Sequence, residues 1–150
     1  MMILKNEGLP APKFFIDTLK VARKYYDLST YTLNYLRYYF DVRLANVTQH
    51  DAFQDVRILI EIFNKMAADI CFREKLTMDQ TLDRMVNVSM NMVMLHRIPF
   101  GKYKGMLFDE AMQDAGAKDW CQWLYKNGKD LSPDLIFTLE SCLKSQSSLL

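Results

Sequence analysis

The chain has 150 residues, of which half are hydrophobic and a quarter are charged. This composition is typical of a globular protein and excludes a disordered one, and the length allows one ordinary domain or two small ones. Nineteen basic and eighteen acidic residues give a formal net charge of +1. The net charge by itself therefore makes no case for nucleic acid or for an acidic partner.

The cysteines and the hydropathy pattern indicate a reducing compartment and a protein outside the membrane. Cys71, Cys121 and Cys142 are far apart and form no CxxC or Cys/His cluster, which argues against a zinc site. Free thiols are typical of a reducing environment. No segment has the ~18 apolar residues that a membrane span needs, and the first residues lack a secretory signal pattern. We therefore expect a cytoplasmic protein without membrane contact.

The first part of the chain predicts a short strand and three helices. The strand is KFFI (13–16), a brief apolar run. Helices are predicted over 17–27, and over 31–40 with Ser29 as its cap. The third helix has the clearest pattern, with apolar residues stepping by four and three along one face. We expect that face to lie in the core, and it comprises Ala52, Val56, Leu59, Phe63 and Met66.

The middle of the chain predicts a capped helix and then a hairpin. Thr77 and Gln80 have the spacing of a capping box, which favours a helix start. After Met90 the pattern changes to an extended lead-in that reaches FGKYKG (100–105). Its two glycines suit a tight reversal in which the backbone adopts positive φ.

Three further helices are predicted after the hairpin. One begins at Asp109 or the residue before it, and one covers 118–127. Ser132 followed by Pro133 predicts the last helix, as a cap followed by proline at the first helical position. An apolar stripe at spacings of three and four is expected in the core of this part, and it comprises Trp120, Trp123 and Leu124.

The predicted fold class is α+β and mostly helical, with three parts along the chain. We expect a first unit over 1–70, a helical connector over 71–91 and a hairpin–helix module over 92–150.

His50 and Asp55 are a candidate catalytic pair. Inside one helix they would lie ~140° apart, so they converge only if His50 belongs to the loop before the helix. An imidazole can act as a general base near neutral pH, and a carboxylate can bind Mg²⁺ or Mn²⁺. Together they suit metal-dependent phosphodiester hydrolysis. Alternatively, Asp51 and Asp55 only complement the helix dipole, and His50 is a capping or surface residue.

The hairpin offers a second candidate site. Lys102 and Lys104 can contact phosphates, and Tyr103 between them can stack on a base. This predicts a module that binds or guides nucleic acid. The alternative is a solubilising turn with Phe100 and Tyr103 buried beneath it.

Two sets of motifs resemble the DEDDh 3′–5′ exonuclease family of the exonuclease X type. IDTLKVARKYY and HDAFQDVRILIEIF, between Phe14 and Met66, resemble the last third of its ribonuclease-H-like domain. The FGKYKG hairpin, the aromatic helix and the SPDL helix resemble the family's C-terminal module. The resemblance implies that His50 is the general base and Asp55 the last ligand of a Mg²⁺ or Mn²⁺ site.

The resemblance also implies that part of the active site lies elsewhere. The family's DxE motif and a further aspartate have no counterpart here, and Asp55 alone cannot hold a metal pair. The chain could be half of a split enzyme, a relative that binds without cutting, or a truncated product. An unpaired strand at 13–16 would invite a complementing chain or a second copy.

The expected function is therefore an exonuclease-related protein that acts on 3′ ends of nucleic acid, with DNA favoured over RNA. The alternative is a catalytically inactive module that binds nucleic acid or protein.

Overall fold

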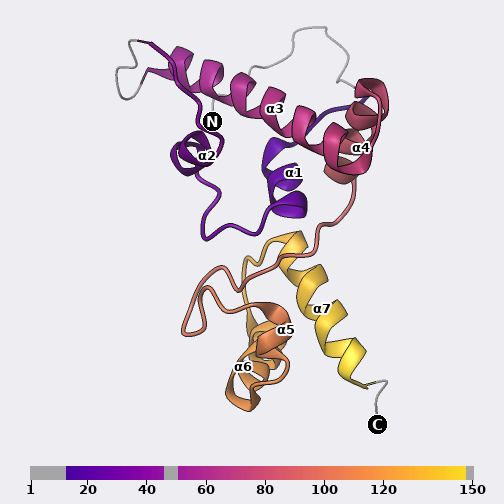
Figure 1. Cartoon of the computed structure of the whole chain (residues 1–150). Coiled ribbons are helices and arrows are strands. Elements are labelled where there is room, and N and C mark those ends of the chain that lie inside the picture. The colour runs from indigo at the N-terminus through magenta and orange to yellow at the C-terminus, as the bar shows by residue number, and fades with distance from the viewer. Residues whose placement is uncertain (1–12, 46–50, 148–150) are drawn as a thin grey trace, which may run out of the picture.

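The computed structural model describes residues 13–45 and 51–147, and it is mostly helical, as predicted (Figure 1). Seven helices lie in the described ranges: α1 (Thr18–Tyr25), α2 (Leu33–Tyr39), α3 (Ala52–Glu74), α4 (Met78–Met90), α5 (Phe108–Ala111), α6 (Ala115–Asn127) and α7 (Pro133–Ser147). The only isolated β pairing among these residues is one antiparallel bridge between Arg97 and Leu107.

The strand predicted at 13–16 is wrong. This segment is irregular backbone, and the side chains of Phe14 and Phe15 are 67% and 53% exposed. No neighbouring strand within the described chain offers it a ladder. The segment is instead fixed at its end by Asp17, whose backbone N–H donates a 2.7 Å hydrogen bond to Ser89 Oγ of α4.

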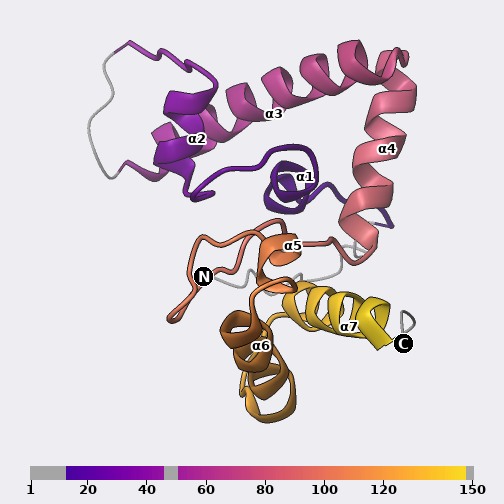
Figure 2. The ribbon, with the colours of Figure 1, turned by 60° about the horizontal axis from the view of Figure 1, so that its bottom comes forward.

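The first four helices share one hydrophobic core. α3 and α4 meet at a corner, and α1 packs inside it against both, while α2 lies along the first half of α3 (Figure 2). The most deeply buried side chains come from α1, α3 and α4 and include Val21, Ala22, Ile62, Met66, Ile70 and Met85. This arrangement places α4, which covers most of 71–91, within the first core.

The predicted N-cap is confirmed for α4 and is wrong for α2. The capping box of α4 is confirmed, with Thr77 and Gln80 each accepting a hydrogen bond from the other's backbone N–H. Ser29 is not the cap of α2. Thr32 takes that role and accepts a hydrogen bond from the N–H of Tyr35, because the helix begins only at Leu33.

The predicted core stripe of α3 is wrong for most of its members. Val56 and Leu59 are 54% and 39% exposed, whereas Ile58 and Ile62 are buried. α2 packs against α3, and Ile58 and Ile62, which share a buried cluster with Leu36 of α2, lie about 100° from the predicted stripe at 100° per residue. Of the predicted set, Met66 is fully buried and Phe63 is half-buried.

The hairpin and α5–α7 form a second core. Its buried members are Ile98, Phe108, Ala111, Met112, Ala117, Cys121, Leu124, Leu135 and Leu139. The start of α7 at Pro133 is confirmed, and Ser132 Oγ accepts a hydrogen bond from the N–H of Leu135. Trp123 is 57% exposed and does not belong to this core, because α6 buries the face that carries Ala117, Cys121 and Leu124.

Candidate functional site

The structure places one member of the predicted catalytic pair. Asp55 lies in the first turn of α3 with an exposed side chain, and its backbone N–H donates to the carbonyl of Asp51. Asp51 is the N-cap and accepts a 3.0 Å hydrogen bond from the N–H of Phe53. His50 lies outside the described residues, so its distance from Asp55 stays a prediction.

The described carboxylates do not suit a two-metal centre. Such a centre needs several carboxylates that converge on cations about 3.5–4 Å apart. Within residues 13–45 and 51–147, His, Cys, Asp and Glu side chains gather nowhere in a group of three or more that could hold a metal ion. Asp55 with these residues alone therefore does not fit the Mg²⁺ or Mn²⁺ site that the family resemblance implies.

The FGKYKG segment forms the expected tight reversal. Gly101 and Gly105 have φ of +85° and +88°, and the N–H of Ile98 donates to the carbonyl of Met106 across the turn. Lys102 and Lys104 are exposed at its tip. The hairpin therefore projects two cations from the second core.

Tyr103 packs against the second core at the base of the turn. Its ring is half-buried against Trp120, with 5.9 Å between ring centroids. Lys102 Nζ lies 5.1 Å from the Tyr103 ring centroid, a cation–π distance. Lys102 and Tyr103 thus form one small cluster on the hairpin, and neither lines the cleft described next.

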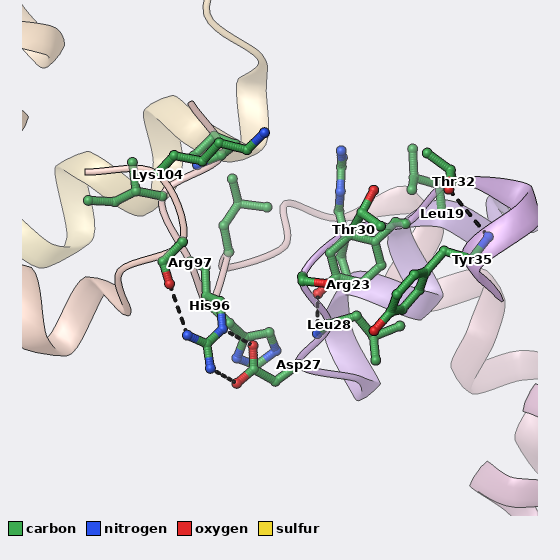
Figure 3. Close-up of a pocket in the computed structure, with 16 residues that line it drawn as sticks. Leu19, Arg23, Asp27, Leu28, Thr30, Thr32, Tyr35, His96, Arg97 and Lys104 are labelled. Atoms are coloured by element: carbon green, nitrogen blue, oxygen red, sulfur yellow. Dashed lines mark hydrogen bonds and ion pairs between the residues drawn. The ribbon is translucent and has the colours of Figure 1, made fainter. Parts of the chain in front are cut away.

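A cleft of about 810 Å³ lies between the hairpin and the segment that follows α1 (Figure 3). One wall comes from α1 and residues 27–32 with Tyr35 of α2, and the other from residues 95–99 with Lys104 and Gly105. Its volume falls within the range of about 300–1,000 Å³ that is usual for ligand sites. The two cores meet at this cleft, which places residues far apart in the sequence around one space.

Cations outnumber anions in the cleft walls. Arg23 projects from α1, while Arg97 and Lys104 come from the hairpin side, and His96 lies next to Arg97. Asp27 is the one acidic residue among the described lining residues. The formal charge of the lining is +2, from three cations, Arg23, Arg97 and Lys104, and one anion, Asp27, with His96 left out of the count. This balance favours an anionic ligand.

Asp27 and Arg97 form a two-pronged ion pair across the cleft (Figure 3). Arg97 Nε donates to Asp27 Oδ1 at 2.8 Å, and Arg97 Nη2 donates to Asp27 Oδ2 at 2.9 Å. These hydrogen bonds lower the pKa of the Asp27 carboxyl and raise the pKa of the Arg97 guanidinium. Asp27 is therefore an anion at neutral pH, seated in the fork of Arg97.

Two tyrosines complete the wall opposite the hairpin. The hydroxyl of Tyr31 donates to the carbonyl of Tyr26 at 2.7 Å and accepts from the N–H of Leu28, and burial raises its pKa. These bonds fix the turn that carries Asp27. Tyr35 is 37% exposed, and its ring offers an aromatic face to a ligand.

Of the predicted site residues that the structure describes, Lys104 lines this cleft, and Asp55 does not. Sequence reasoning missed Arg23, Asp27, Arg97 and Tyr35. Asp27 and Arg97 are 70 positions apart, and no motif links them. The local signal that could have been used is the concentration of hydroxyl and aromatic residues at 29–35.

Comparisons with known proteins add no relative. No protein-family model, no curated protein and no solved structure matches the chain. The resemblance to exonucleases therefore depends on the motifs in the sequence. None of the helices in the described ranges is long and apolar enough to cross a membrane.

Proposed function

We propose that the protein is a nucleic-acid-binding module that holds a strand in the cleft between its two cores. The observation that carries this proposal is the convergence of Arg23, Arg97 and Lys104 on one space that also exposes the ring of Tyr35. Proteins that bind single strands combine a cationic groove for phosphates with aromatic rings for bases. The cleft has both features, with Arg23 and Tyr35 on helices of the first core and Arg97 and Lys104 on the hairpin.

The proposal assigns two roles to the side chains of the cleft. Lys104 and Arg97, on the hairpin side, and Arg23, on α1, would neutralise phosphates and release counterions. Tyr35 would stack on a base, a contact worth about 1–3 kcal/mol. Lys102 and Tyr103 would contribute at the rim, where Lys102 adds long-range attraction. DNA is the form of nucleic acid that we propose, and a cytoplasmic location accords with the free cysteines.

Binding of a labelled oligonucleotide tests this function. Fluorescence anisotropy would be followed with single-stranded DNA at several salt concentrations for the wild type and for Arg23→Ala/Lys104→Ala. We expect the double variant to bind at least tenfold more weakly, and the slope of log K against log salt to fall by about 1–2 because two phosphate contacts are lost. Lys126→Ala/Lys129→Ala removes two exposed lysines outside the cleft and is the matched control.

The outcomes distinguish binding in the cleft from non-specific attraction by the total charge of the protein. Equal weakening by the two double variants would show that binding depends on total charge only. Absence of binding by the wild type even at low salt would end the proposal.

A second candidate is a metal-dependent 3′–5′ exonuclease whose remaining carboxylates come from a complementing chain or a second copy. Asp55 favours it, because this carboxylate is exposed at a helix start and makes no ion pair with another described residue. α3 also exposes an apolar stripe of Phe53, Val56 and Ile60, with 69%, 54% and 52% exposure. In this candidate the first unit is part of a ribonuclease-H-like domain, His50 is the general base, and the stripe is covered by the partner.

Cleavage assays test the second candidate. The purified chain would be incubated with end-labelled DNA and Mg²⁺ or Mn²⁺, alone and with a cell extract from which this chain has been removed. We expect shortening of the 3′ end only in the supplemented reaction, and its loss in Asp55→Ala. Cleavage that survives Asp55→Ala would rule out this role for Asp55.

A further inference from the structure

Asp27 occupies the two-pronged donor face of Arg97, one of the two guanidinium groups that line the cleft. A guanidinium presents parallel N–H donors that fit a carboxylate and a phosphate in the same two-pronged manner. In the present structure Asp27 fills that position, with both of its oxygens on Arg97 at 2.8 and 2.9 Å. A phosphate that approached Arg97 from the cleft would meet this carboxylate first.

Arg97 is anchored independently of Asp27. Its Nη1 donates a 2.9 Å hydrogen bond to the carbonyl of Gly105, within the same hairpin. Asp27 belongs to the opposite wall, directly after α1. If Asp27 left, Arg97 would remain fixed to the hairpin with its Nε and Nη2 donors free. The ion pair thus joins the two walls but can dissociate, whereas the guanidinium remains bonded to the hairpin.

The cost of detaching Asp27 is small. The side chains of Asp27 and Arg97 are 39% and 38% exposed, so water can solvate both ions when they separate. Exposed ion pairs contribute little to stability, and two-pronged Arg–carboxylate pairs are the stronger of them. Arg23 and His96, which also line the cleft, would stay near either anion. A phosphate that also makes further contacts in the cleft can therefore replace Asp27 on Arg97.

We propose that Asp27 is a built-in competitor of the ligand, which occupies the phosphate position on Arg97 until a nucleic-acid phosphate displaces it. This inference rests on the proposed function and adds how the same cleft is regulated. Displacement also breaks the ion pair that joins the two walls, so binding and widening of the cleft would occur together. The carboxylate would discriminate against weakly held anions, because only a ligand with further contacts can replace it.

Asp27→Asn tests the competitor directly. The amide keeps the size of the side chain but loses its charge, so it holds the Arg97 fork less tightly. We expect Asp27→Asn to bind single-stranded DNA about two- to fivefold more tightly than the wild type, the range that corresponds to an exposed ion pair. Asp27→Asn should give no gain in affinity when it is made in an Arg97→Gln background, because the gain requires the freed guanidinium.

Glu110→Gln provides the matched control. Glu110 is exposed in α5 and lies close enough to raise the pKa of Arg97, after the larger effect of Asp27, but makes no hydrogen bond to it. Its neutralisation changes the net charge by the same amount without freeing the fork. We expect a smaller gain in affinity than for Asp27→Asn. Thermal unfolding of each variant would verify that the fold is retained.

The outcomes distinguish this inference from the proposed function. If the wild type binds through Arg23 and Lys104 but Asp27→Asn does not bind more tightly, the competitor role is wrong and the proposed function stands. An equal gain from Glu110→Gln, or a gain that persists without Arg97, would also overturn it. If neither the wild type nor Asp27→Asn binds DNA at low salt, both proposals fail.

Discussion

The carboxylate of Asp134 accepts a 3.0 Å hydrogen bond from the backbone N–H of Val93, which joins the start of α7 to the segment between the two cores. Asp134 is 4% exposed, and Lys20 Nζ of α1 lies 3.6 Å from the same oxygen. One turn later, Thr138 Oγ1 accepts a hydrogen bond from the N–H of Leu95. α7 therefore fixes residues 93–95, which lead directly into one wall of the cleft.

Asp134→Ala should lower the free energy of unfolding by about 1–3 kcal/mol, because it leaves the buried N–H of Val93 without its partner. Asp134→Asn keeps an acceptor oxygen and should cost less. Urea denaturation of both variants measures the difference. Asp119→Ala removes an exposed carboxylate of α6 and should change stability by at most about 0.5 kcal/mol. A loss from Asp134→Ala no larger than this control would show that the hydrogen bond contributes little.

The face of α3 that forms the core can be tested with two isoleucines of the same helix. Ile62 is fully buried and Ile60 is 52% exposed. Ile62→Ala should cost about 2–5 kcal/mol, since it removes apolar contacts and leaves a cavity. Ile60→Ala should cost less than about 1 kcal/mol in the isolated chain. Thermal or urea unfolding separates the two, and equal losses would mean that the exposed stripe is covered in solution.

The sequence predicted the helices well because their ends carry local signals. Thr77 with Gln80, and Ser132 with Pro133, form caps whose chemistry involves only neighbouring residues. The buried face of α3 could not be predicted in the same way. Apolar side chains of this helix extend beyond the predicted stripe, so the choice between Val56 and Ile58 depends on where the neighbouring helices pack.

The candidate site was even less accessible to sequence reasoning. Asp27 and Arg97 have no shared motif, and their contact depends on the tertiary packing that places the hairpin beside the segment after α1. Lys104 was predicted from the glycine-bounded turn, which is a local feature. Its place in the cleft depends on the opposite wall, which includes Arg23 of the first core. Local patterns predicted this residue but not its surroundings.

The two glycines of the hairpin should differ in their tolerance of alanine. Both have positive φ, which an L side chain adopts at a cost of about 1–2 kcal/mol. A Cβ on Gly101 would also lie 2.6 Å from Trp120 Cζ2, whereas a Cβ on Gly105 would meet nothing within 4 Å. Gly101→Ala should therefore destabilise the second core by at least about 1 kcal/mol more than Gly105→Ala, since overpacking costs about 1–3 kcal/mol. Similar melting temperatures for the two variants would show that Trp120 moves aside freely.

Alkaline pH should weaken the first core through its tyrosines. The hydroxyl of Tyr25 donates a 2.9 Å hydrogen bond to Glu74, and burial, followed by this bond, raises the pKa of Tyr25 to about 12. Burial and a hydrogen bond to Asp69 raise the pKa of Tyr26 further. Because the folded state favours the protonated phenols, their stabilisation is fully present below about pH 10, the unfolded value, and is lost as the pH rises towards 12.

Urea midpoints measured between pH 8 and pH 11 test this dependence. The wild type should lose stability steadily above pH 10. Tyr25→Phe should be about 1 kcal/mol less stable at pH 8, because it lacks the hydrogen bond to Glu74, and should show a shallower decline above pH 10. Tyr38→Phe, at a side chain that is 75% exposed, is the control and should follow the wild-type curve. A decline of the same steepness in Tyr25→Phe would assign the alkaline loss to other groups and remove the Tyr25–Glu74 contact as its cause.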